Sequence, residues 1–346
     1  MTEKDSSISC AIPNESSNDS SEKPAEIKAD GSFNRQTNRF TTPFGNNLGE
    51  LPVEAGRYRL LWSAACPWAH RAVIVRKILG LENTISVGKV SPLRPRIERV
   101  DWEFSLDKDS VDPVLGVQYV SEVYLNADSD YAGRPTVPVM VDLETKKAVN
   151  NDYFKLTNYF ETVWSPFHKE NAPDLYPEDL REDIDTLNEM IFHDVNNGVY
   201  KCGFAQSQEA YELAYDTLFA RLDELEERLS TRRFLFGDII TDSDVRLYTT
   251  LVRFDAAYYT AFRTNRNLIR EFTNLWGYAR DLYQTIGFGE TTDFDSIKRH
   301  YHLSITIDPG KGEVMILPKG PDTSVWLTEH NREKLSNHKE KFLIKG

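Results

Sequence analysis

Apolar residues change their spacing near residue 165, and this change divides the chain into two parts. Before it, four short β-prone runs lie at residues 57–63, 85–90, 137–142 and 147–150. Segments with helical spacing lie between and after them, at residues 67–79, 118–126 and 152–163. The helix at 67–79 ends before Gly80, a residue type suited to the position just past a helix C-terminus. The first part of the chain is therefore predicted to mix strands and helices.

The order of these elements, β-α-β-α-β-β-α, is that of a thioredoxin-like domain, which we place at residues 39–165. After residue 166 strand patterns nearly vanish. Large apolar residues at 211, 215, 218, 222, 225 and 229 step by four and three, which marks one face of a long helix. A coiled coil would show the same spacing, but the repeat stops after three heptads, so a core-facing bundle helix is favoured. We predict an all-α domain over residues 166–310.

A second helix of that domain is predicted from its first residues. Thr241 and Asp244 have the spacing of a capping box, in which a threonine precedes the helix and a carboxylate follows three residues later. Outside the two domains, residues 1–38 are rich in Ser, Asn, Glu and Lys with few large apolar residues, and we expect a disordered tail. Residues 311–346 are rich in Gly and Lys and are expected to form a C-terminal extension over the surface.

Composition excludes several classes of partner. The 41 basic and 54 acidic residues give a net charge of −13, which argues against nucleic-acid binding. No window approaches the ~18 apolar residues of a membrane helix, and the N-terminus lacks the apolar stretch of a secretory signal. Three cysteines lie far apart, at positions 10, 66 and 202, in neither metal-ligand nor paired spacing. We therefore expect a cytoplasmic protein without a structural metal site and without a membrane partner.

Cys66 is the candidate for chemistry. It precedes Pro67, which suits the first position of the predicted helix because the missing N–H would have no intrahelical partner there. The unpaired N–H groups and dipole of a helix start favour a thiolate, so we predict a lowered pKa for Cys66. Ala69 stands where a C-x-x-C partner would be, so an external thiol has to resolve any disulfide. A buried structural cysteine is the competing interpretation.

A second constellation surrounds Pro138. An X-Pro bond just before a strand is, in this fold, the place where a cis proline exposes the backbone of the preceding residue. Val137 precedes Pro138, so its main chain is expected to pair with a peptide-like thiol.

These motifs belong to a larger pattern that resembles the xi-class glutathione transferases, also called glutathionyl-hydroquinone reductases. The matches keep their order and span roughly residues 40–320. They are Cys66-Pro-Trp-Ala-His-Arg71, Trp102-Glu-Phe104, Tyr131-Ala-Gly-Arg134 with Thr136-Val-Pro-Val139, Asn196-Asn-Gly-Val-Tyr-Lys201 with Gly203-Phe-Ala205, Thr249-Thr-Leu-Val-Arg-Phe-Asp255, Asp281-Leu-Tyr-Gln284, and Ile297-Lys-Arg-His-Tyr301.

The resemblance implies a thioredoxin-like domain followed by an all-helical domain, usually paired as a homodimer. Such enzymes reduce glutathionyl-hydroquinones: the cysteine takes glutathione from the substrate, and a second glutathione releases it as a disulfide. Carried onto this chain, Cys66 is the nucleophile. Tyr200 and Tyr301 lie over the quinol, and their hydroxyls donate to its oxygens, as neutral phenols are able to. The thiol peptide is held by Trp102, Arg134 and the Val137 backbone, where an arginine fork suits a carboxylate.

One departure concerns the thiol. Where the family usually shows Asn-Asn-Glu-Ser, whose last two residues bind the γ-glutamyl end of glutathione, this chain has Asn150-Asn151-Asp152-Tyr153. Asp152 and Tyr153 are still the expected thiol-binding positions, but the co-substrate is either glutathione or another low-molecular-weight thiol. Two alternatives stay open. One is a broader thioltransferase or dehydroascorbate reductase that uses Cys66, and the other is a non-catalytic binding protein on the same fold.

Overall fold

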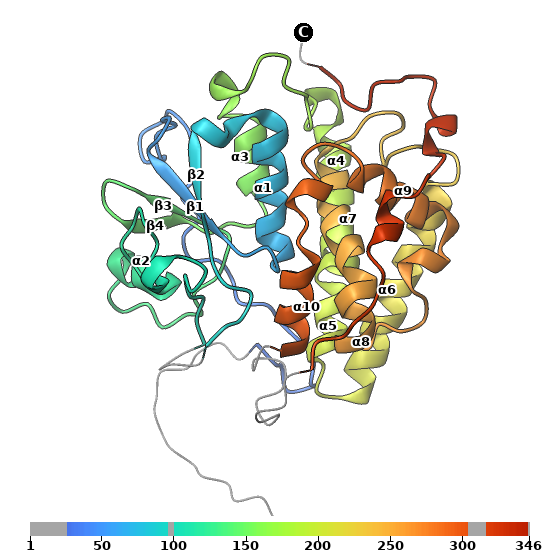
Figure 1. Ribbon diagram of the computed structural model, residues 1–346, viewed down its shortest axis with the longest axis horizontal. Coiled ribbons are helices and arrows are strands. Elements are labelled where there is room, and N and C mark those ends of the chain that lie inside the picture. Colours follow the sequence, from blue (N-terminus) through green and yellow to red (C-terminus); the bar gives the residue numbers. More distant parts are fainter. Residues whose placement is uncertain (1–25, 96–99, 304–315, 345–346) are drawn as a thin grey trace, which may run out of the picture.

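The first domain is built on a mixed four-stranded sheet. The computed structural model describes residues 26–95, 100–303 and 316–344 (Figure 1). The strands β1 (Tyr58–Trp62), β2 (Ile85–Lys89), β3 (Val139–Asp142) and β4 (Lys147–Asn150) lie in the order β2-β1-β3-β4. β1 and β2 are parallel, whereas β3 runs antiparallel to β1 and to β4. The predicted thioredoxin-like domain is confirmed, and all four strands fall within the predicted runs.

Three helices cover this sheet. α1 (Pro67–Leu79) and α3 (Leu156–Glu161) lie between the sheet and the second domain, and α2 (Val120–Ala127) packs against β4 (Figure 1). α1 is buried along almost its whole length because one side faces the sheet domain and the other faces α7. Gly80 follows α1 with φ 75°, a left-handed conformation that glycine adopts without steric cost. α3 begins four residues later than predicted, because the chain first makes a turn at Asp152.

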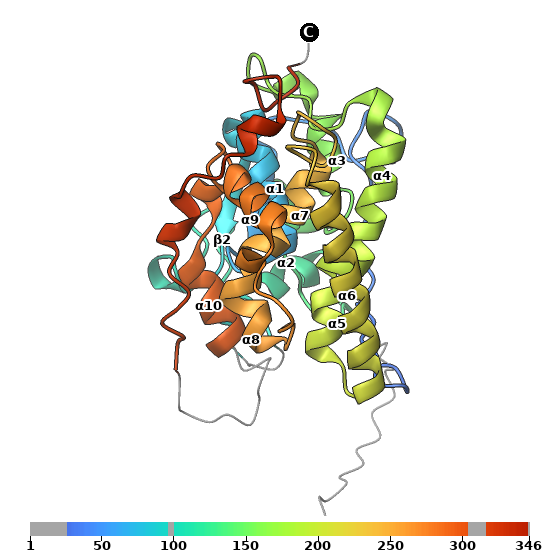
Figure 2. The same cartoon turned by 90° about the vertical axis from the view of Figure 1, so that its right-hand side faces the viewer.

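The second domain is helical, as predicted. Its helices are α4 (Arg181–Met190), α5 (Gly198–Phe204), α6 (Gln208–Arg228), α7 (Asp242–Arg253), α8 (Tyr259–Ala261), α9 (Thr273–Tyr283) and α10 (Phe294–Leu303). α6 is the long helix predicted from its spacing, and it runs beside α5 with Leu218, Leu222 and Leu225 buried (Figure 2). None of the helices in the described ranges is long and apolar enough to cross a membrane.

The helix α7 connects the two domains at both of its ends. Its start has the predicted capping box, in which the N–H of Thr241 donates to the carboxylate of Asp244 at 2.8 Å. One turn further, Arg246 pairs with Asp242 at 2.6 Å and donates to the carbonyl of Phe154 beside α3 at 2.8 Å. At the opposite end Arg253 reaches the loop before Cys66. The helix therefore fixes how the sheet domain sits against the helical domain.

The N-terminal prediction is wrong for residues 26–38. This segment is packed between the domains: Phe33 is buried with its ring 5.2 Å from that of Phe204, and the carbonyl of Gly31 accepts from the N–H of Gln206 at 2.9 Å. Its few apolar residues are enough to anchor it because its polar side chains also find partners across the domain boundary. The rest of the predicted tail, residues 1–25 with Cys10, lies outside the described residues.

The described part of the C-terminal extension, residues 316–344, runs over α9 (Figure 2). Trp326 anchors it, with its ring 4.8 Å from that of Trp276. Further along, the carbonyl of Leu343 accepts from the N–H of Asp174 at 2.7 Å. The segment therefore covers part of the surface of the helical domain.

Candidate active site

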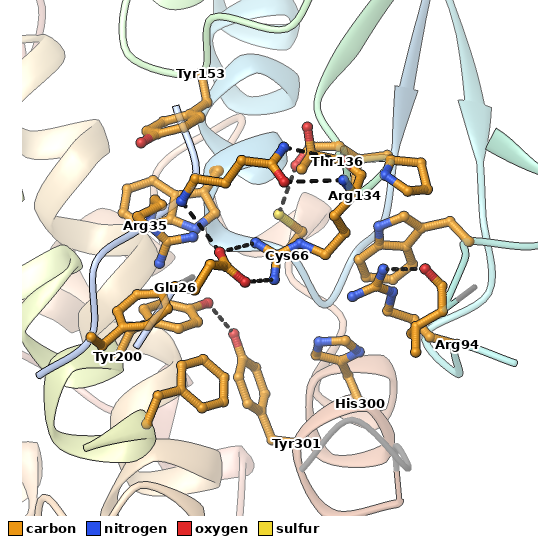
Figure 3. Close-up of a pocket in the computed structure, with 18 of the residues that line it drawn as sticks. Glu26, Arg35, Cys66, Arg94, Arg134, Thr136, Tyr153, Tyr200, His300 and Tyr301 are labelled. Atoms are coloured by element: carbon orange, nitrogen blue, oxygen red, sulfur yellow. Dashed lines mark hydrogen bonds and ion pairs between the residues drawn. The ribbon is translucent and has the colours of Figure 1, made fainter. Parts of the chain in front are cut away.

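Cys66 lies at the point where β1 passes into α1. It is the N-cap residue of α1, with an extended backbone, and Pro67 takes the first helical position. Its side chain is only 7% exposed, yet it lines a cavity of about 430 Å³ between the two domains (Figure 3). The thiol donates to the carbonyl oxygen of Val137 at 3.2 Å. This carbonyl belongs to the Val137–Pro138 peptide bond, which is cis as the sequence predicted. The sulfur therefore stands at a helix start with a cavity in front of it.

The predicted lowering of the Cys66 pKa is wrong. Burial raises the pKa of this thiol above its ordinary value, and this effect outweighs the backbone N–H groups of Ala69 and Trp68 and the positive charges of Arg253 and Arg35, which act in the opposite direction. The helix start is visible in the sequence, whereas the desolvation of Cys66 arises only when the two domains assemble. In the free protein the sulfur is thus a thiol that donates to Val137, and it has to lose its proton when it reacts.

This raised pKa predicts a pH dependence for modification of Cys66. Only the thiolate reacts with iodoacetamide, so below the pKa its rate of alkylation should rise about tenfold per pH unit. We expect this rise to continue from pH 6.5 to at least pH 8, because the raised pKa lies above the ordinary thiol value of about 8.5. The same measurement on the Cys66→Ala protein gives the rate of alkylation at the other cysteines, which is subtracted. A plateau of the rate below pH 7.5 would show an ionised sulfur and contradict this assignment.

A pair of tyrosines forms the wall of the cavity contributed by the helical domain. The hydroxyls of Tyr200 on α5 and Tyr301 on α10 lie 2.6 Å apart, and that of Tyr258 lies 3.2 Å from Tyr301. Burial raises the pKa of all three, so they are neutral phenols at pH 7. The ring of Phe262, 5.2 Å from that of Tyr200, adds an apolar face. The structure thus brings the three predicted catalytic residues, Cys66, Tyr200 and Tyr301, to one cavity.

Trp102 forms a second wall together with two residues that the sequence analysis missed. Its ring stacks on that of His300 at 5.2 Å and 18°, and the Arg94 guanidinium lies 4.8 Å from its centroid. Nδ1 of His300 donates to the carbonyl of Pro92 at 2.7 Å. Burial lowers the pKa of His300 to about 4, so the imidazole is neutral and its Nε2 is a hydrogen-bond acceptor.

The remaining predicted thiol-binding residues are placed unevenly. Arg134, Val137 and Tyr153 line the cavity, whereas Asp152 is absent from its lining. The carboxylate of Asp152 accepts from the N–H groups of Phe154 at 3.1 Å and Lys155 at 3.2 Å. Asp152 therefore stabilises the turn before α3. This role differs from the contact with the thiol that the sequence predicted.

Arg134 lines the cavity but already has a partner. Its two terminal nitrogens bind the two carboxylate oxygens of Glu26 at 2.9 and 3.0 Å (Figure 3). The same segment supplies Arg35, whose guanidinium lies 4.6 Å from the ring centroids of both Trp68 and Tyr200. Nothing in the sequence pattern pointed to Glu26 or Arg35, because both fall in the segment assigned to the tail. His300, in contrast, lies inside one of the matched motifs.

Behind Cys66, a buried arginine fixes the loop that carries it. Arg253 donates to the carbonyls of Ala64 at 2.9 Å and Ala65 at 3.0 Å, and to Nδ1 of His70 at 3.2 Å. Because Nδ1 accepts, Nε2 of His70 carries the proton and donates to the hydroxyl of Thr291 at 2.8 Å. His70 is therefore part of the support of the Cys66 loop.

A thioredoxin-like domain, a helical domain and a cysteine at the start of the first helix define a protein of the glutathione transferase fold. Two family models match the chain: the "Glutathione S-transferase, N-terminal domain" over residues 65–163 and the "Glutathione S-transferase, C-terminal domain" over residues 208–281. Glutathionyl-hydroquinone reductase YqjG of Escherichia coli (strain K12) is 41% identical, with 81% of this chain and 87% of that protein covered. Its glutathione-bound structure has a TM-score of 0.74 at 40% identity and covers 83% of this chain and 92% of that one.

Two further solved structures are similar over most of their length. A glutathione transferase from Gordonia bronchialis is 49% identical with a TM-score of 0.79, and 84% of this chain and 88% of that one are covered. The glutathione S-transferase Xi from Phanerochaete chrysosporium is 40% identical with a TM-score of 0.79, and 86% and 95% are covered. The chain therefore belongs to the Xi class of glutathione transferases. The family resemblance inferred from the sequence motifs is confirmed.

Proposed function

We propose that the protein is a cysteine-dependent thiol transferase that removes glutathione, or a related low-molecular-weight thiol, from glutathionyl-hydroquinone-like aromatics. The observation that carries the proposal is that the Cys66 sulfur and the Tyr200–Tyr301 hydroxyl pair face one cavity (Figure 3). A sulfur nucleophile and a place for a phenolic ring with its oxygens are the two things that such a reaction needs. The name of the Escherichia coli relative supports the same activity.

The reaction has two halves. In the first, the Cys66 sulfur attacks the sulfur of the adduct, an S–S bond forms and the carbon–sulfur bond to the ring breaks. The Cys66 thiol loses its proton and the ring carbon gains one, so a hydroquinone leaves and a Cys66 mixed disulfide remains. In the second half, a free thiol attacks the mixed disulfide and loses its proton, while Cys66 leaves and regains one. Two thiols thus supply the two electrons, and Ala69 leaves Cys66 without a nearby resolving cysteine in its own motif.

The tyrosines act on the aromatic half of the substrate. Neutral phenol hydroxyls donate hydrogen bonds to the ring oxygens, where negative charge develops while the carbon–sulfur bond breaks. The rings of Tyr200 and Phe262 offer apolar faces to the substrate ring. The proposal also includes a cytoplasmic location and a homodimer, which rest on the cysteine usage and on the resemblance to the family.

Tyr200→Phe and Tyr301→Phe variants test the proposal. Each removes one donor and keeps the ring, so kcat for a glutathionyl-hydroquinone should fall roughly 10–100-fold, the effect of one lost hydrogen bond to developing charge. Reduction of 2-hydroxyethyl disulfide, which has no phenolic oxygen, should change less than about twofold. Tyr211→Phe, on the outer part of α6 where its hydroxyl donates to the Arg263 carbonyl at 2.7 Å, is the matched control. If both variants keep full quinol turnover, the broader thioltransferase becomes the better assignment.

A further inference from the structure

The Arg134 guanidinium is occupied by the chain itself. Glu26 binds it in a two-pronged arrangement, at 2.9 and 3.0 Å, inside the cavity that also holds Cys66 (Figure 3). Gln36 holds this pair in place: its backbone N–H donates to Glu26 at 3.2 Å, and its side-chain oxygen accepts from the N–H of Arg134 at 3.0 Å. An arginine fork matches the two oxygens of one carboxylate. Glu26 thus fills the position that a carboxylate of the thiol was expected to take.

The other expected ionic anchor, Asp152, lies outside the lining of the cavity. The Asp152 carboxylate accepts from two backbone N–H groups of its own turn, and it does not line the cavity. Next to it, the ring of Tyr153 packs 4.9 Å from that of Trp68, where a small hydroxyl residue was expected from the family pattern. The cavity lining within the described residues therefore offers no free ionic partner at either position expected to bind a charged end of a glutathione-like peptide.

Two other charged side chains line the cavity within the described ranges, and both are arginines. Arg35 donates to Asn197 at 2.8 Å, and Arg94 donates to the carbonyl of Val100 at 3.0 Å. Each still has one buried nitrogen, Nη2 of Arg35 and Nε of Arg94, with no hydrogen-bond partner among the described residues. Arg35 lies against Trp68 and Tyr200, toward the proposed quinol side. Among the residues that the structure describes, Arg94 is therefore the arginine that competes with Arg134 as receptor of a thiol carboxylate, and it has to be tested.

We propose that Glu26 sets the thiol specificity of this protein, so that the group of the co-substrate that lies beside Arg134 is an uncharged amide, ester or hydroxyl. The inference rests on the proposed function and narrows its co-substrate. Asn38 and Gln206 line the cavity and offer side-chain amide donors and acceptors to such a group. A second carboxylate brought to the same fork would instead meet the charge of Glu26, which repels it.

The test compares glutathione with its glycyl monoethyl ester, which differ only in the carboxylate. We measure kcat/KM for each as the resolving thiol, with 2-hydroxyethyl disulfide as the oxidised substrate. The wild-type protein should use the ester at least as well as the acid. The Glu26→Gln substitution removes the carboxylate that binds Arg134 and keeps the shape of the side chain. We therefore expect kcat/KM for glutathione to rise about tenfold and kcat/KM for the ester to change less than twofold.

Several results would overturn the inference. One is a wild-type preference of tenfold or more for the acid, which means that the thiol displaces Glu26. Another is an acid-to-ester ratio that stays the same in Glu26→Gln and Glu26→Ala. A third is an acid-to-ester ratio that changes in Arg94→Gln and in neither Glu26 variant. Glu54→Gln, which alters a glutamate paired with Arg57 at 3.0 Å on another face, is the matched control.

The choice of 2-hydroxyethyl disulfide separates this inference from the proposed function. Failure to turn over a glutathionyl-hydroquinone removes the proposed function but leaves the comparison of acid and ester intact. If the protein reacts with neither thiol through Cys66, both fail. Thermal unfolding of each Glu26 variant shows whether a change in kcat/KM comes from the thiol site or from loss of the fold.

Discussion

Replacement of Cys66 by alanine is expected to abolish thiol-dependent turnover, with a loss of at least about a thousandfold. The proposed reaction has no step that another group of the cavity is able to take over, because the sulfur forms the covalent intermediate. The fold should survive, since the substitution removes one buried sulfur and its hydrogen bond to Val137. We expect a cost of about 1–2 kcal/mol in the free energy of unfolding, measured by chemical denaturation.

Cys202→Ala is the matched control for this experiment. Cys202 is fully buried on α5, and burial raises its pKa to about 12, so it is an inert thiol at neutral pH. Its removal should leave kcat/KM within about twofold of the wild type. Undiminished turnover in Cys66→Ala would remove the proposed mechanism and favour a binding protein or another nucleophile.

Arg253→Met is expected to give the largest loss of stability among the residues around the site. Arg253 is fully buried and donates to the carbonyls of Ala64, Ala65 and Thr249. Methionine fills a similar volume but leaves these carbonyl groups without that donor, so we expect a cost of about 3–5 kcal/mol in the free energy of unfolding. Activity of the folded fraction should fall as well, because the loop before Cys66 loses the contact that holds it to α7.

Chemical denaturation and turnover of the same preparation together check this prediction. Arg299→Met serves as control, since Arg299 makes a surface ion pair with Asp295, and such pairs contribute about 0–1 kcal/mol. A loss below 1 kcal/mol for Arg253→Met, with full turnover, would show that the carbonyls find other donors and that the loop needs no such contact.

The fold could be predicted well from the sequence wherever the signal is local. The strands, α1, α6 and α7 followed from alternation, helical spacing and the capping residues Thr241 and Asp244. The start of α3 was misplaced because Asp152 makes a turn there with its own side chain, which the apolar spacing does not reveal. Local patterns report local structure, and the boundary of a short helix depends on such side-chain contacts.

The site was predicted only in part. The motifs identified the residues that meet at the cavity, including Cys66, Tyr200 and Tyr301. They could not reveal that Glu26 pairs with Arg134, because 108 positions separate the two residues and the composition around Glu26 is that of a disordered segment. The pKa of Cys66 was predicted in the wrong direction for a related reason. Desolvation depends on how the two domains close over the sulfur, which is a property of the tertiary structure.

The most direct test of Cys66 as the nucleophile is a single turnover without free thiol. The wild-type protein is mixed with one equivalent of a glutathionyl-hydroquinone, and the intact mass of the protein, the masses of its peptides after proteolysis and the released aromatic are measured together. We predict one glutathionyl group on the peptide that contains Cys66 and one equivalent of hydroquinone, with neither product from Cys66→Ala. Release of hydroquinone without a protein adduct, or an adduct on another residue, would contradict the mechanism.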